Sequence, residues 1–387
     1  MNANLFDPII LTQELIKKPS VTPIDAGALD LLQSVLSELG FVCTRYKFED
    51  VDNLYARLGT NAPNFCFAGH TDVVPVGDES KWSVPPFAAI IQDGILIARG
   101  AADMKSAIAA FVSAAKRFIE TEASFGSISF LITGDEEGVA INGTKKLLAA
   151  ITKTGENIDH CIVGEPTCPN QLGDMIKNGR RGSLNCHVIS KGVQGHVGYP
   201  EKAANPIPTL VRFLDTIVSH QLDEGAKGFQ ASNLEIVTID VGNKASNVIP
   251  ETASARFNIR FNTNHTGKSL SEWLEATRQS VAHGFQGELS LEIAISGEPF
   301  FTQPCQFTQI IQDSAQKVTG IRPELSTTGG TSDARFIKDY CTVCEFGLVG
   351  ATIHKIDEQT QTKDILGLAD IYYEILVAYF KKFGGEN

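Results

Sequence analysis

Long apolar runs are missing from this sequence, and their absence excludes one class of protein. No stretch approaches the roughly 20 consecutive apolar residues that a helix needs to cross a bilayer. The opening residues, MNANLFDPIILTQELIKKPS, also lack a basic segment followed by an unbroken apolar core, which is the pattern of a secretory signal peptide. We therefore expect a cytoplasmic protein without a membrane partner.

The chain has no excess of basic residues either. It carries 33 Lys and Arg against 45 Asp and Glu, a formal net charge of -12 at pH 7. Surfaces that bind nucleic acids need a basic face that attracts phosphate groups. The charge balance therefore argues against a nucleic-acid partner.

Cysteines are too sparse for a disulfide framework. The eight cysteines are scattered over 387 residues, which fits a reducing compartment. One pair, Cys341 and Cys344 in CTVC, has the spacing of redox and zinc sites. This pair lies in an apolar stretch typical of a strand, where residues three apart point to opposite faces. We interpret both as buried structural thiols, with a thiol-redox protein as the alternative.

What the chain does have is a regular alternation of helix and strand patterns. Helical periodicity predicts helices over 7–19, 26–40 and 102–120, and apolar runs predict strands over 53–59, 64–70, 127–134 and 160–166. Such alternation is typical of an α/β fold with a mixed, largely parallel sheet flanked by helices. The same kind of pattern returns after about residue 296, with a predicted helix over 307–320 and a last one over 366–383.

The middle of the chain follows a different pattern. Between 182 and 295 the predicted order is β-α-β-β-α-β, the order of a ferredoxin-like α+β module. The length also favours two compact units over one. We expect one domain built from 1–181 and 296–387, with residues 182–295 inserted as a second domain.

Acids and imidazoles follow several of the predicted strands. The candidates are His70, Asp72, Asp103, Asp135, Glu136, Glu137, Glu165 and His354. Taken singly, Asp103 could cap a helix and the acids of GDEEG could form a solvated loop. Together they supply the nitrogen and oxygen ligands that zinc takes. Five or six such ligands suggest two metals sharing a carboxylate, as in two-metal hydrolases. Glu136 and Glu137 diverge as neighbours, so we expect one ligand and one general base.

Five motifs in this order carry a family resemblance: GHTDVVP, RGAADMKS, GDEEG, GEPT and HKIDE. They resemble the M20 metallopeptidases, a family of co-catalytic zinc hydrolases, and the similarity covers essentially the whole chain. The resemblance implies a di-zinc catalytic domain with an inserted domain through which two copies form a homodimer. It also implies two Zn²⁺ per subunit, with Co²⁺ or Mn²⁺ as possible substitutes.

Position by position, the resemblance implies a role for each residue of the site. His70 and Glu165 would hold one zinc, Glu137 and His354 the other, with Asp103 bridging both. Asp72 would orient His70. Glu136 would be the general base that takes a proton from the attacking water and later passes it to the leaving amine.

Further motifs, IKNGRRGS, KGVQGHVGYP, SNVIP, GGTSDARF and ATIHK, resemble family members that hydrolyse N-succinyl-LL-diaminopimelate in lysine and peptidoglycan precursor synthesis. The resemblance implies that His196 reaches the partner subunit's site and stabilises the oxyanion. Arg180 and Arg260 match carboxylate-binding positions. The other matching substrate-contact positions are Ser183, Tyr199, Asn247, Gly330 and Thr331.

One position departs from this pattern. Members with that substrate often have Asn four residues before the last histidine, where this chain has Gly350. A water could replace the missing amide. Deacetylation of acetylornithine, or another aminoacylase or peptidase activity of the same family, is the alternative function. A non-catalytic binding protein would be expected to lack Glu136 or a metal ligand, and every one of these residues is present.

Overall fold

The computed structural model describes residues 4–122 and 125–384, so both ends of the expected first domain, 1–3 and 385–387, lie outside the described residues. The chain divides into two compact units. Unit 1 comprises Met1–Asn178, Thr302–Ser326 and Ser332–Asn387, and unit 2 comprises Gly179–Phe301 and Thr327–Thr331. Within the described ranges, no helix is long and apolar enough to cross a membrane.

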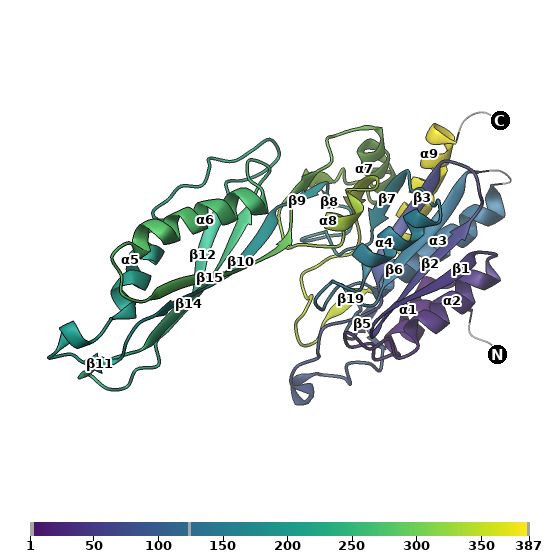
Figure 1. Ribbon diagram of the computed structural model, residues 1–387. Coiled ribbons are helices and arrows are strands. Elements are labelled where there is room, and N and C mark those ends of the chain that lie inside the picture. The colour runs from purple at the N-terminus through teal and green to yellow at the C-terminus, as the bar shows by residue number, and fades with distance from the viewer. Residues whose placement is uncertain (1–3, 123–124, 385–387) are drawn as a thin grey trace. The chain divides into compact units, whose positions relative to one another are not determined.

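Unit 1 is built on a mixed eight-stranded sheet (Figure 1). In spatial order its strands are β1 (Val42–Phe48), β2 (Val51–Leu58), β6 (Ser127–Thr133), β3 (Asn64–His70), β7 (His160–Val163), β18 (Thr342–Glu345), β8 (Met175–Lys177) and β17 (Glu324–Ser326). The central strands β6, β3, β7 and β18 run parallel, whereas β1, β2 and β6 pair antiparallel. A smaller sheet contains β19 (Gln359–Gln361), β5 (Ile95–Ile97) and β4 (Ile90–Gln92). This confirms the expected α/β class with a mixed sheet.

Helices cover both faces of the large sheet (Figure 1). They are α1 (Pro8–Ile16), α2 (Ala28–Glu38), α3 (Lys105–Thr121), α4 (Thr144–Lys153), α7 (Gln306–Thr319), α8 (Ala334–Ile337) and α9 (Thr362–Phe383), with a short 3₁₀ turn at Glu79–Lys81. α3 and α9 pack against each other, while α4 contacts β6 and α8 contacts β18. Gly40 lies just after α2 in the left-handed region, with φ of 87°, a conformation in which glycine commonly ends a helix.

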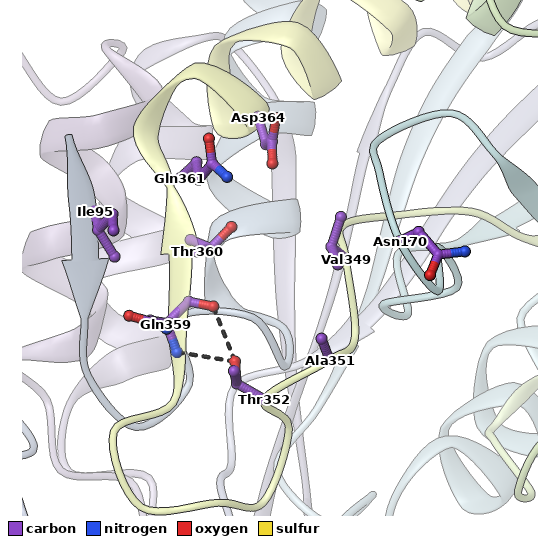
Figure 2. A pocket seen from close by; sticks show the side chains of 9 residues that line it. All are labelled: Ile95, Asn170, Val349, Ala351, Thr352, Gln359, Thr360, Gln361 and Asp364. Atoms are coloured by element: carbon purple, nitrogen blue, oxygen red, sulfur yellow. Dashed lines mark hydrogen bonds between the residues drawn. The ribbon is translucent and has the colours of Figure 1, made fainter.

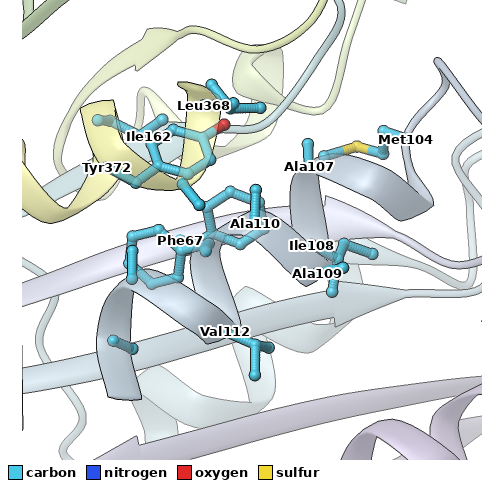
Figure 3. Close-up of a cluster of buried hydrophobic side chains, with 14 of the residues drawn as sticks. Phe67, Met104, Ala107, Ile108, Ala109, Ala110, Val112, Ile162, Leu368 and Tyr372 are labelled. Carbon is cyan, nitrogen blue, oxygen red and sulfur yellow. The ribbon is translucent and has the colours of Figure 1, made fainter. Parts of the chain in front are cut away.

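The core of unit 1 lies between the sheet and α3 and α9. The Phe67 ring lies 4.5 Å from that of Phe111 and 5.7 Å from that of Tyr372, measured between centroids. Figure 3 shows Phe67 and Ile162 of the sheet close to α3 and α9. The buried face of α3 is rich in alanine, and these small side chains let the helix approach both neighbours closely. This packing fixes the sheet edge from which the candidate site projects.

Unit 2 contains an antiparallel four-stranded sheet in the order β12 (Asn233–Asp240), β14 (Thr252–Phe261), β10 (Gly182–Lys191) and β15 (Glu288–Gly297). Helices α5 (Pro206–Val218) and α6 (Gly267–Ala282) pack on it through one apolar cluster. Buried and less buried residues alternate along β14 because one sheet face meets the helices and the other does not. The chain order β-α-β-β-α-β is the predicted ferredoxin-like one.

Short elements complete unit 2. They are β9 (Gly179–Arg180), β16 (Phe300–Phe301), β11 (Gly195–His196), β13 (Val248–Ile249) and a 3₁₀ turn at Pro200–Lys202. In both units, strands of two or three residues were not predicted, because such lengths are too short to show a period.

Candidate active site

Parallel strands bring four of the candidate side chains to one edge of the sheet. His70 is the last residue of β3, and it lies opposite Thr133 at the end of β6. Glu136 and Glu137 follow β6 after Gly134 and Asp135, and Glu165 follows β7, which pairs with β3 on its other side. Since the carboxyl ends of parallel strands meet at the same edge, these residues gather there although they are far apart in sequence.

The first group of possible metal ligands consists of His70, Asp103 and Glu165. One ligand atom from each lies within 4.8 Å of the other two. Nε2 of His70 is 3.2 Å from Oδ1 of Asp103 and 3.9 Å from Oε1 of Glu165. All three residues are buried.

The second group consists of Asp103, Glu137 and His354, again with ligand atoms within 4.8 Å. Nε2 of His354 lies 3.0 Å from Oε1 of Glu137 and 3.4 Å from Oδ2 of Asp103. Asp103 therefore directs one carboxylate oxygen to each group. A shared carboxylate between two three-residue groups is the arrangement that holds two metal ions close together.

His354 projects from a short loop, residues 352–359, in the connection that follows β18. Its φ is 60°, a left-handed conformation that is uncommon for residues other than glycine. The Thr352 hydroxyl donates to the Gln359 carbonyl and accepts from its N–H, both at 3.0 Å, so it joins the two ends of the loop (Figure 2). Asp357 inside the loop accepts hydrogen bonds from the N–H and hydroxyl of Ser83. The two Thr352 hydrogen bonds close this loop around His354.

Asp72 uses its main chain and its side chain differently. Nδ1 of His70 lies 2.8 Å from the Asp72 carbonyl oxygen, to which it donates, and 3.7 Å from Oδ1 of the Asp72 carboxylate. The carboxylate instead accepts from the N–H groups of Glu136 and Glu137, at 3.2 and 3.1 Å. Asp72 thus directs Nε2 of His70 towards Asp103 through its main chain and holds the GDEEG segment through its side chain.

The electrostatics of the site fit bound cations. Burial raises the pKa of Glu165 well above its usual value, and the nearby Asp103 and Glu136 raise it further. Among the residues that the structure describes, Oε1 of Glu165 is a buried oxygen without a hydrogen-bond partner. Burial also raises the pKa of Glu136. A divalent cation would offset this crowding of negative charge, and the imidazole and carboxylate donors suit zinc or a similar ion.

Two histidines already balance part of this charge. Burial alone would raise the pKa of Asp103, but hydrogen bonds from His354 and His70 keep it below its usual value. Hydrogen bonds to Asp103 and, second, to Glu137 raise the pKa of His354 to about 10. A metal ion would take the place of the proton between each histidine and carboxylate.

The arginines that the sequence singles out lie in unit 2. Ser183 on β10 faces Arg260 on β14, and burial lowers the pKa of Arg260. Arg180 donates to the carbonyl of Thr328, which directly precedes the GGT segment containing Gly330 and Thr331. We call Arg180, Ser183, Arg260, Gly330 and Thr331 the arginine group.

A second set of expected contact residues also lies in unit 2. His196 on β11 pairs with Val248 on β13, and Val197 N–H donates to the carbonyl of Asn247. The rings of His196 and Tyr199 lie 5.6 Å apart between centroids. We call His196, Tyr199 and Asn247 the histidine group. His196 and Tyr199 follow the end of β10 that is opposite to Ser183, and Asn247 lies beside them just before β13 (Figure 1). The two groups in one chain are therefore separated by nearly the length of β10, roughly 30 Å at strand geometry.

Sequence reasoning gave no role to two buried acids beside the ligands. Asp333 lies close enough to Glu136 to raise its pKa, and Glu358 accepts a hydrogen bond from the N–H of Asp103. Both belong to motifs that the sequence does single out, GGTSDARF and HKIDE. Their burial, which depends on distant segments, was the missing signal.

The space around Gly350 explains its departure from the expected asparagine. A Cβ atom at this position would lie 2.8 Å from the carbonyl oxygen of Pro166, which is main chain and cannot swing aside. Gly350 N–H also donates to the carbonyl of Cys168 at 2.9 Å. In this chain a side chain at position 350 requires the backbone after Glu165 to move.

Comparison with known proteins agrees with this geometry. Residues 66–378 match the family described as Peptidase family M20/M25/M40. The chain belongs to this family. It is 55% identical over 383 residues to a succinyl-diaminopimelate desuccinylase from Maricaulis maris, covering 99% of this chain and 98% of the other. It is 57% identical over 377 residues to the protein of the same name from a Caulobacter species, covering 97% of each.

Solved structures of M20 proteins share the fold. An M20 family metallo-carboxypeptidase from Sulfolobus solfataricus superimposes with a TM-score of 0.81 at 20% identity, covering 96% of this chain and 99% of the other. A protein from Bacillus subtilis, described as a dinuclear metal binding peptidase from the M20 family, gives a TM-score of 0.72 at 14% identity, covering 97% and 99%. The family match and the curated desuccinylase relatives, not these structures, identify the chain as a metal-dependent amide hydrolase of the M20 family.

Proposed function

We propose that this M20 protein hydrolyses N-succinyl-LL-diaminopimelate to succinate and LL-diaminopimelate, a step that supplies lysine and peptidoglycan precursors. The observation that carries this proposal is identity of about 55% along nearly the whole chain to curated succinyl-diaminopimelate desuccinylases. The two ligand groups that share Asp103 support the same reaction type.

Two Zn²⁺ ions per subunit are the proposed cofactors, with Co²⁺ or Mn²⁺ as substitutes. His70 and Glu165 would hold one ion, Glu137 and His354 the other, and Asp103 both. When bound, the ions lower the pKa of water and polarise the amide carbonyl. The orphaned oxygen of Glu165 supports this assignment because a buried carboxylate oxygen needs a positive partner.

Glu136 is the proposed general base. It belongs to neither ligand group, although it directly precedes the ligand Glu137. Its raised pKa makes its carboxylate a stronger base than an exposed glutamate. In the proposed reaction it takes a proton from the attacking water and delivers it to the departing amine nitrogen, so the acid and base steps use one side chain.

The arginine group is proposed to bind the substrate's carboxylates. Planar guanidinium groups can hold both oxygens of a carboxylate, and an acidic protein must concentrate such groups locally. The pairing of Ser183 with Arg260 places a hydroxyl beside one of these arginines. Arg180 lies beside the GGT segment, whose main chain approaches its guanidinium closely at Gly329.

A homodimer is part of the proposal. The histidine and arginine groups of one chain are too far apart to contact one small substrate, so a second copy would supply His196, Tyr199 and Asn247. Exposed apolar side chains on unit 2 support an interface: Val237 and Ile239 on β12 are 66% and 58% exposed, and Val211 on α5 is 56% exposed. We also propose a cytoplasmic location, which the eight free cysteines support.

The decisive experiment compares two substrates. We expect the zinc-loaded protein to have a much higher kcat/KM on N-succinyl-LL-diaminopimelate than on N-acetylornithine, and a chelator should abolish both activities. A preference for N-acetylornithine would retain the two-metal hydrolase and discard the named substrate.

A pair of neighbouring variants tests the assigned roles. We expect Glu136→Gln to lower kcat by about 10²–10⁴-fold, the usual contribution of general acid–base catalysis, while keeping both metals. Glu137→Gln is the matched control, and it should lose metal as well as activity. Loss of metal in Glu136→Gln, measured by elemental analysis, would show that Glu136 is a ligand instead of the base.

A further inference from the structure

Glu358 lies four residues after His354 and is completely buried. Its carboxylate binds the segment that leads into α3. Oε1 accepts from the N–H groups of Ala102 and Asp103, at 2.8 and 3.0 Å, and Oε2 accepts from the N–H of Gly100 at 3.1 Å. The Glu358 carboxylate thus accepts from three main-chain N–H groups of a segment that lies more than 250 residues earlier in the sequence.

Arg99 completes the charge balance of this arrangement. Its Nη1 lies 2.7 Å from Oε2 of Glu358, its Nη2 donates to the carbonyl of Pro75, and its guanidinium carbon is 5.3 Å from the Trp82 ring centroid. The carboxylate is therefore already neutralised by a buried arginine. Glu358 belongs to neither ligand group, so its contacts hold main chain instead of metal.

Glu358 and His354 belong to one short loop. The Thr352 hydroxyl joins the ends of that loop at Gln359, as Figure 2 shows. One end of the loop carries His354, the histidine of the second ligand group. At the other end, Glu358 accepts a hydrogen bond from the N–H of Asp103, whose carboxylate both ligand groups share. A shift of Glu358 would move Asp103 relative to His354.

We propose that Glu358 is a positioning residue that fixes the shared carboxylate of Asp103 relative to His354 and thereby sets the spacing of the two metal ions. The inference rests on the proposed two-metal amide hydrolysis and adds to it a residue that touches neither metal nor substrate. Groups that orient metal ligands in this way typically change metal affinity or activity 10–100-fold when altered.

The test replaces the carboxylate by an amide of the same shape. In Glu358→Gln the amide NH₂ must face a main-chain N–H or Arg99, so the segment around Asp103 shifts. Metal-free protein is titrated with Co²⁺ and followed by calorimetry and by visible absorption, which reports ligand geometry. We expect Co²⁺ affinity to fall about 10–100-fold with an altered spectrum, and kcat at saturating Co²⁺ to fall much more than KM changes.

Asp357→Asn is the matched control. It makes the same acid-to-amide change at the neighbouring position of the same loop, where the side chain contacts Ser83 and not the 99–103 segment. We expect its Co²⁺ affinity and spectrum to match those of the wild type. If Glu358→Gln does not fold by circular dichroism, Glu358→Asp keeps the charge opposite Arg99 but shortens the side chain, and the same losses are expected.

Wild-type Co²⁺ affinity and spectrum in the folded Glu358 variant would overturn the inference. Failure of the proposed function is distinguishable from this result. A wild-type protein that binds two Co²⁺ ions but does not hydrolyse the succinyl substrate would remove the function, while the Co²⁺ titration would still decide the role of Glu358.

Discussion

Lys105, the first residue of α3, carries an amine where a charge is costly. It is completely buried, and its Nζ donates to the carbonyls of Leu15 and Lys18 at 2.9 and 2.7 Å. Burial lowers its pKa from 10.5 to about 7, although Asp25 and other nearby carboxylates partly oppose this. The amine therefore anchors the last turn of α1 and the residues after it to the start of the helix that follows Asp103.

This shift predicts a specific dependence of stability on pH. Between pH 7 and 10.5 the unfolded chain binds a proton on Lys105 that the folded chain does not hold. Stability therefore rises with pH in that window, relative to a variant without the amine, and the difference is flat below pH 7. We expect the free energy of unfolding of wild type minus Lys105→Met, from urea titrations, to rise across this window.

A control on the same helix separates this effect from general alkaline destabilisation. Lys116→Met removes a partly exposed amine that pairs with Glu120 one turn further along. The curve for this variant should stay parallel to that of the wild type. If the Lys105→Met curve is also parallel to the wild type, the buried amine is protonated in the folded protein throughout the window.

Among the connecting elements, the segment from β18 to the His354 loop is restricted by close main-chain approach. Cys168 and Val349 form an isolated parallel bridge, and Gly350 follows directly. Pro166, whose carbonyl leaves no room for a Cβ at position 350, is the residue after Glu165. Glycine at position 350 therefore allows the close approach of the segment that contains Glu165, a proposed metal ligand.

Gly350→Asn introduces the residue common at this position in the resembling family members, and we expect it to impair this protein. A side chain must displace Pro166 and with it Glu165, so thermal stability and zinc content should fall. No gain in kcat/KM on the succinyl substrate is expected. Ala351→Asn, at the neighbouring exposed position, should leave both quantities unchanged. Higher kcat/KM in Gly350→Asn would show that the loop adapts and that the amide contacts substrate.

For the whole molecule, the separation of the two groups in unit 2 leads to a prediction about subunits. Each group has its own local support, the β10–β14 pairing for the arginine group and β11 with β13 for the histidine group. A strand of ten residues lies between them and cannot shorten. If both groups act on one substrate molecule, they must come from two chains.

Mixing two inactive variants tests this arrangement. Alone, His196→Ala should have a much lower kcat with unchanged zinc content, and Glu136→Gln should be nearly inactive. In a mixed dimer, one site keeps Glu136 from one chain and His196 from the other, so mixing after reversible dissociation should restore part of the activity. Sedimentation verifies that dimers form. Mixed dimers without restored activity would place His196 outside the partner's site.

Much of the fold and the candidate site could be read from local pattern. Helices such as α2 show their period within their own residues, and strands such as β3 and β6 show as short apolar runs. The positions of His70, Glu136 and Glu165 after predicted strands already indicated one edge of the sheet. β1 and the three-residue strands were not predicted, because they are stabilised by pairing with neighbours and show little periodicity of their own.

The sequence by itself determined which residue types stand at the ends of which strands, and therefore the family and the chemistry of its site. The tertiary structure alone decided how those residues are held. It directs the two oxygens of Asp103 to different histidines, gives the Asp72 carboxylate to main-chain N–H groups, buries Glu358 against the segment before α3 and leaves no room at Gly350. The reason is physical: residue order sets periodicity and local turns, whereas burial and hydrogen-bond partners depend on segments that meet only after folding.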